Sequence, residues 1–149
     1  MTSVDLVDYG KGYLVRAVGA TPGKTPADIV RLHTDPAAAA VFGDIGRYES
    51  FECSENGNVC VASWKTGVRG EMTVTVRKRV IDDRTIEFES TDDSHVRTEG
   101  SWTIDEDERV SIRQLIFPPV PSWIPRAFVR RVIRRKFRDV YDDINKSLN

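Results

Sequence analysis

The chain has 149 residues, of which 40% are hydrophobic and 30% are charged, as in an ordinary soluble globular protein and unlike a disordered one. A formal net charge of −1 argues against a general nucleic-acid binder. Two cysteines are too few for a disulfide scaffold, and no apolar run approaches the ~18 residues of a membrane span. We therefore expect one domain over residues 1–149, located in the cytoplasm.

The first third of the chain predicts one strand followed by two short helices. Residues 1–12 are polar and contain glycine, so we expect a loose lead-in before a first strand over Tyr13–Ala20. Thr25 is a suitable N-cap for a short helix that begins at Pro26, where the missing N–H costs nothing. A second short helix is expected over Ala37–Phe42.

Beyond these helices, apolar residues recur at every second position, which is typical of half-buried strands. Asn56-Gly57 is a strong hairpin signal, and a two-residue turn there would pair Cys53 with Cys60 and Glu49 with Trp64. The two cysteines would then be close enough for a bridge. In a cytosolic protein we expect them to stay reduced.

Two more hairpins follow from the same alternation. Strand patterns over 71–80 and 85–90 form the first, and those over 96–104 and 109–117 form the second, through an acidic loop. The sheet should end before Pro118, because proline cannot sit in a central strand.

The one long helical pattern spans Pro125–Leu148. Its apolar residues recur at steps of three or four: Val129, Ile133, Phe137, Val140, Ile144 and Leu148. An antiparallel sheet with one apolar face needs a cover, and only this helix is long enough. The expected fold class is α+β, a curved antiparallel sheet of about six or seven strands around a long C-terminal helix, with two short helices after the first strand.

Three stretches stand out: Pro26–Val30 with Thr34–Pro36, Gly100–Ile104 with the form GxWxI, and Phe117–Pro125 before the long helix. Together with the order of elements, these stretches resemble those of the START-like (SRPBCC) superfamily of helix-grip proteins, and the resemblance extends over roughly Tyr13 to Leu148. This superfamily includes START lipid-transfer domains, polyketide cyclases, plant PR-10 proteins and coenzyme Q-binding proteins. The last stretch resembles the polyketide-cyclase and coenzyme Q-binding branch.

In this family the sheet and the final helix enclose an apolar cavity that binds sterols, phospholipids, quinones, hormones or polyketides. The resemblance implies that the chain binds or transports a hydrophobic small molecule, such as a lipid, quinone or polyketide-like compound. The inward faces of the predicted strands and helix would line the site: Phe51, Trp64, Met72, Val74, Phe88, Trp102, Ile112, Gln114, Ile133, Phe137 and Tyr141. The alternative is that these side chains fill a core, with Gln114 satisfied by backbone or water.

Seven of the thirteen residues from Arg126 to Arg138 are basic. On a helical projection Arg126 and Arg130 share a side with Phe137, so Arg130 is a candidate for holding a carboxylate or phosphate at the cavity mouth. The alternative is that both arginines are solvated.

A second strip of the helix consists of Ile124, Phe128 and Val132, beside Arg131 and Arg135. Apolar side chains ringed by arginine could make a transient contact with an anionic membrane surface. They could equally pack under the two short helices.

The inventory for catalysis is poor. His33 and His95 are the only histidines, and neither belongs to a metal-binding spacing. Nucleophile-elbow, phosphate-loop and dinucleotide motifs are absent from the sequence. We therefore expect no metal and no cofactor, and no residue is selected as catalytic. Three functions stay open: a binding or transfer module, a polyketide cyclase or dehydratase-like enzyme, and a protein-interaction or chaperone-cofactor domain.

Overall fold

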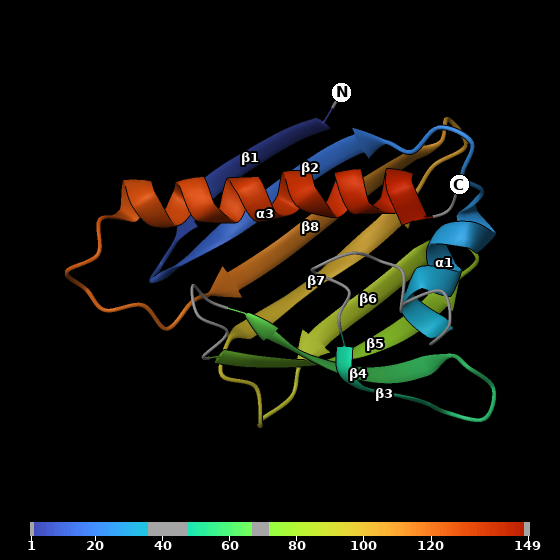
Figure 1. The fold of residues 1–149 in the computed structure, drawn as a ribbon, viewed down its shortest axis with the longest axis horizontal. Coiled ribbons are helices and arrows are strands. Elements are labelled where there is room, and N and C mark those ends of the chain that lie inside the picture. The colour runs from blue at the N-terminus through green and yellow to red at the C-terminus, as the bar shows by residue number, and fades with distance from the viewer. Residues whose placement is uncertain (1, 36–47, 67–71, 148–149) are drawn as a thin grey trace.

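The computed structural model describes residues 2–35, 48–66 and 72–147 (Figure 1). The elements follow one another as β1 (Thr2–Tyr9), β2 (Gly12–Ala20), α1 (Pro26–Thr34), β3 (Tyr48–Cys53), β4 (Val59–Thr66), β5 (Met72–Asp82), β6 (Thr85–Ser90), β7 (Arg97–Ile104), β8 (Arg109–Phe117) and α3 (Arg126–Ser147).

The strands form one eight-stranded antiparallel sheet in the order β1-β2-β8-β7-β6-β5-β4-β3. In Figure 1 the long helix α3 crosses the half of the sheet made by β1, β2 and β8, while α1 lies at the end of the sheet that carries β4. The predicted α+β class is confirmed, as is the sheet wrapped around a long C-terminal helix.

The sheet has one strand more than the six or seven expected, because residues Thr2–Tyr9 form strand β1. The expectation of a loose lead-in there is wrong. Val4 is buried and Leu6 half-buried, whereas Ser3 and Asp5 are exposed, so the segment does alternate. Its register with β2 closes at Tyr9 and Gly12, around a two-residue turn with Gly10 at φ 56°. A positive φ is easy only for glycine, which makes this short hairpin possible.

Helix α1 begins as predicted. The side chain of Thr25 accepts a hydrogen bond from the backbone N–H of Asp28, and the Asp28 carboxylate accepts one from the N–H of Thr25, which completes a capping box. The predicted second short helix, Ala37–Phe42, lies outside the described residues.

The β3–β4 hairpin pairs Cys53 with Cys60, as predicted, but its turn is longer than two residues. Ser54 and Val59 close the hairpin through a backbone bond of 2.8 Å. The predicted pairing of Glu49 with Trp64 is wrong, because an irregularity after Tyr48 shifts the register and places Tyr48 opposite Trp64. Such an irregularity adds one residue to one strand, which alternation alone does not reveal.

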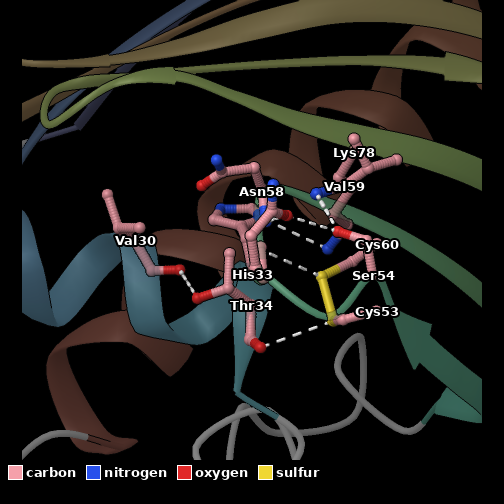
Figure 2. Close-up of a disulfide and its surroundings, with 11 residues drawn as sticks. Val30, His33, Thr34, Cys53, Ser54, Asn58, Val59, Cys60 and Lys78 are labelled. Atoms are coloured by element: carbon pink, nitrogen blue, oxygen red, sulfur yellow. Dashed lines mark hydrogen bonds between the residues drawn. A yellow bond between two sulfur atoms is a disulfide. The ribbon is translucent and has the colours of Figure 1, made fainter.

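The two cysteines form a disulfide, so the expectation that they stay reduced is wrong (Figure 2). Their Cα atoms are 4.0 Å apart. They lie next to the hydrogen-bonded pair Ser54–Val59, in the alternate position of the ladder where facing side chains come closest. The Sγ atom of Cys53 also lies 3.4 Å from the carbonyl oxygen of Thr34, at the end of α1.

The two later hairpins and the C-terminal helix have their predicted places. β5 and β6 pair around the turn at 82–85, and β7 and β8 pair from Arg97–Phe117 to Ile104–Val110. The sheet ends at Phe117, immediately before the prolines.

Helix α3 is anchored to β2 and β8 by Tyr141, which is fully buried. Its hydroxyl donates to the carbonyl oxygen of Val110 at 2.7 Å, and burial raises the pKa of the phenol. The ring lies directly over Gly19, where a Cβ atom would come within 2.4 Å of it. Gly19 therefore permits the helix to approach the sheet this closely.

Candidate functional site

The inner face of the sheet, which packs against α3, has two clusters of buried side chains and several half-buried side chains beside them. The main core lies beneath α3, and a smaller cluster consists of Val74, Val76 and Val96. Phe88 and Ile116 pack against both clusters, although each is only half-buried. We call the half-buried inner-face side chains of this region the inner strip: Trp64, Met72, Phe88, Gln114 and Ile116.

The residues predicted to line a ligand site divide by burial. The buried ones are Val74, Trp102, Ile112, Ile133, Phe137 and Tyr141. The half-buried ones are Phe51, Trp64, Met72, Phe88, Gln114 and Arg130. Within the buried group, all except Val74 belong to the main core, so they help to hold α3 on the sheet. The half-buried group keeps surface that a ligand can contact.

Gly100, the first residue of the GxWxI stretch, is closely packed and has no room for a side chain. It pairs with Phe88 on one side and with Gln114 on the other. A Cβ atom at this position would lie 2.2 Å from the carbonyl oxygen of Arg113 and 3.0 Å from the Phe88 ring. The missing side chain therefore lets the Phe88 ring lie over the backbone between the two strands.

The polar group of the inner strip is Gln114, whose amide nitrogen donates to the hydroxyl oxygen of Thr98 at 2.7 Å. That hydroxyl in turn donates to the carbonyl oxygen of Leu115, also at 2.7 Å. Thr98 is buried and lies on the same face of β7 as Trp102. Thr98 is not among the predicted site residues, although strand alternation places it, two residues before Gly100, on the inner face.

A second polar pair lies beneath α1. The Nδ1 atom of His33 is 3.1 Å from Nζ of Lys78, both residues are buried, and the imidazole ring meets the Trp102 ring edge-on at 4.3 Å (Figure 2 shows His33 and Lys78). Burial, reinforced by the Lys78 charge, holds the pKa of His33 well below its ordinary value of 6.5. The His33 Nε2 atom is enclosed and has no hydrogen-bond partner among the described residues. His33 therefore attaches α1 to the sheet and presents no accessible base.

The first turns of α3 are held by a carboxylate of the protein itself. Arg126 and Arg130 both donate to Oδ1 of Asp8 on β1, Arg126 at 3.1 Å. The hydrogen bond from Arg130, and then that from Arg126, hold the pKa of Asp8 below its usual value. Arg126 also donates to the carbonyl oxygen of Gly12 at 3.2 Å and lies over the Tyr13 ring at 4.5 Å. In this structure the anion that Arg130 binds is Asp8.

A hollow of about 320 Å³ lies on the outer face of the sheet, away from α3. Alternation places its charged side chains opposite the inner strip: Arg77, Arg79, Arg113, Glu87, Glu89 and Glu99. Arg77 and Glu89 form an ion pair at 3.8 Å. This hollow is polar, so it does not have the apolar walls that a hydrophobic ligand requires.

Within the described residues, no group of three or more His, Cys, Asp or Glu side chains is placed to hold a metal ion. Among the helices that the structure describes, none is both long and apolar enough to cross a membrane.

Comparison with known proteins places the fold. No protein-family model matches the chain, and no curated protein matches it in sequence. Among solved structures, a protein of Thermus thermophilus is similar with a TM-score of 0.69 and 19% identity, over 90% of this chain and 95% of that one.

Two further solved structures are informative. The di-domain ARO/CYC BexL from the BE-7585A biosynthetic pathway has a TM-score of 0.66 and 13% identity, over 91% of this chain, which spans 50% of BexL. Human StAR-related lipid transfer protein 5 has a TM-score of 0.54 and 14% identity, over 97% of this chain and 86% of that one. At these identities the likeness establishes the architecture, and the chain therefore has the helix-grip fold of the START-like proteins.

Proposed function

We propose that the protein binds a hydrophobic small molecule between the inner strip and α3, and carries it between sites. The observation that supports this most is the inner strip itself, four apolar side chains and one amide that stay half-buried on the inner face beside the two buried clusters. Ligand sites in proteins have this composition, with mostly apolar walls and few polar groups. The fold supports the same function, because one protein that shares it is named for lipid transfer.

The test uses N-phenyl-1-naphthylamine, an uncharged apolar dye that fluoresces when bound. We expect saturable binding to the wild-type protein and roughly tenfold weaker binding to Phe88→Ala, which removes an aromatic wall of the inner strip. Phe128→Ala is the matched control, because Phe128 is a phenylalanine exposed outside the strip. Both variants are checked for folding by circular dichroism. Dye binding that is non-saturable, or that is equally affected by the two substitutions, would contradict the proposal.

We also propose that the ligand is exchanged at an anionic lipid surface. Three apolar side chains near the start of α3 are exposed, Trp123 by 79%, Phe128 by 50% and Val120 by 39%, and we call them the loop patch. Phe128 does not pack under α1, which lies at the other end of α3 (Figure 1). The exposed cations Arg131 and Arg135 lie within two turns of Phe128 on α3. Exposed aromatic residues beside cations suit an anionic bilayer surface.

Vesicle co-sedimentation tests this contact. We expect the wild-type protein to bind vesicles of phosphatidylserine and phosphatidylcholine, and to bind pure phosphatidylcholine much less. Trp123→Ala should weaken binding to the anionic vesicles about tenfold, because it removes the largest exposed apolar side chain of the loop patch. Ile81→Ala is the control, since Ile81 is 48% exposed on the β5–β6 hairpin. If the two variants sediment alike, the loop patch is not the contact.

A further inference from the structure

We propose that the ligand carries a hydrogen-bond donor, an O–H or N–H group, which binds the side-chain carbonyl oxygen of Gln114. The inference rests on the proposed function, because it assumes that the ligand lies on the inner strip. It adds the chemical class of the ligand: an apolar molecule with a hydroxyl or N–H group, such as an alcohol, a phenol or an amide.

The hydrogen bonds of Thr98 determine the orientation of the Gln114 amide. A hydroxyl has one proton to donate, and a backbone carbonyl can only accept. Because the Thr98 Oγ1 atom lies 2.7 Å from the carbonyl oxygen of Leu115, its proton is used in that bond. The hydroxyl oxygen can therefore only accept from its other neighbour, Gln114, at 2.7 Å.

This proton count fixes the orientation of the Gln114 amide. The two ends of a glutamine amide look alike in coordinates, so its orientation has to follow from its partners. Here the NH₂ group must face Thr98, since the opposite orientation would place two acceptors 2.7 Å apart. The carbonyl oxygen of the side chain is thus directed away from Thr98. It accepts no hydrogen bond from any described residue.

The surroundings make this oxygen a selective group. Gln114 pairs directly with Gly100, which has no side chain, and the Phe88 ring packs close to Gly100 on the other side. Among the other members of the inner strip, Trp64, Phe88 and Ile116 have no acceptor side chain, and Met72 has only a weakly accepting thioether sulfur. An acceptor in an apolar site favours ligands that donate and disfavours those that only accept.

Three naphthalenes of similar size test the inference by displacement of N-phenyl-1-naphthylamine: 2-naphthol, 2-methylnaphthalene and 2-methoxynaphthalene. The measured quantity is the ratio of the 2-naphthol affinity to the 2-methylnaphthalene affinity, because differences in hydrophobicity cancel when this ratio is compared between variants. We expect the ratio to fall roughly tenfold in Gln114→Leu, which removes the acceptor but keeps a similar volume.

The Thr98→Val variant tests whether Thr98 orients the Gln114 amide or only packs beside it. Valine matches threonine in shape but cannot accept the Gln114 N–H, so the amide becomes free to turn over. The preference for 2-naphthol should then fall, while 2-methoxynaphthalene, which only accepts, should gain about threefold or more relative to 2-methylnaphthalene. Gln114→Leu should show no such gain. A merely structural role for Thr98 would change the affinity for all three compounds alike.

The outcomes of this experiment are separable. If no naphthalene displaces the dye from the wild-type protein, the proposed function itself fails. If all three displace it but the ratio is the same in wild type and Gln114→Leu, the donor inference is overturned and the proposed function stands. Should the variants fold poorly, the wild type still decides, because the ¹³C signal of the Gln114 side-chain carbonyl should shift with 2-naphthol and not with 2-methylnaphthalene. An equal response to both compounds would overturn the inference.

Discussion

Gly100→Ala is expected to lower the free energy of unfolding by about 3 kcal/mol, and it should be the most damaging single-methyl change in the sheet. The added Cβ atom would lie 2.2 Å from the carbonyl oxygen of Arg113 and 2.8 Å from Cα of Gln114. Both are backbone atoms of β8, so relief requires the strand to move and its ladder with β7 to stretch. Urea unfolding followed by circular dichroism measures the change.

The control for this substitution is Ser101→Ala, one residue further along β7 and on the outer face. Its effect should stay within about 0.5 kcal/mol, as for an ordinary surface position. Combining Gly100→Ala with Phe88→Leu should not restore stability, because the closest contacts are with backbone and not with the Phe88 ring. A loss below about 1 kcal/mol for Gly100→Ala, or rescue by Phe88→Leu, would contradict this account of the close packing at Gly100.

Gly19→Ala is expected to cost about 2 kcal/mol of unfolding free energy for a different reason. Here the nearest atoms belong to a side chain, the Tyr141 ring, at 2.4 to 2.9 Å from the added Cβ atom. The ring cannot swing away cheaply, since it is fully buried and its hydroxyl is bound to the carbonyl oxygen of Val110. The substitution should therefore push α3 away from β2.

A double-mutant cycle distinguishes this mechanism from a general loss of sheet stability. Tyr141→Leu alone should be destabilising, because it leaves a cavity and removes the hydrogen bond of the hydroxyl to the Val110 carbonyl oxygen. In its presence, however, Gly19→Ala should cost much less, with a coupling of about 1 kcal/mol or more. Additive effects of the two substitutions would show that the ring and the glycine do not restrain each other. At Gly100, by contrast, no side-chain change should restore stability, so the predictions for Gly19→Ala and Gly100→Ala can succeed or fail separately.

The regular elements could be predicted because their signals are local. Period-two alternation predicts β4 to β8, and the period of three to four predicts α3. Both patterns arise because each element buries only one face, so apolar residues recur with the period of the element. The same alternation is present in β1, at Val4 and Leu6, but the polar residues and glycines around it favour a loose segment when only local sequence is considered.

The pairing details depended on information that is not local. The shift that places Tyr48 opposite Trp64 arises from an irregularity in β3, and one residue more or less in a strand changes every later partner. The disulfide between Cys53 and Cys60 was geometrically foreseeable, yet the sequence could not decide its oxidation state. The helical projection places Arg130 on the side of Phe137, but the sequence does not show that Asp8, 122 residues away, meets it there.

By itself, the sequence determined the fold class, the faces of the strands and helix, and the choice of Gln114 as the one polar side chain among apolar neighbours on β8. These follow from periodicity, which each element carries within itself. Only the tertiary structure decided which side chains stay half-buried, how Thr98 orients Gln114, and which carboxylate meets Arg130. Those features join residues far apart in the chain, and they depend on strand register and on how closely α3 approaches the sheet.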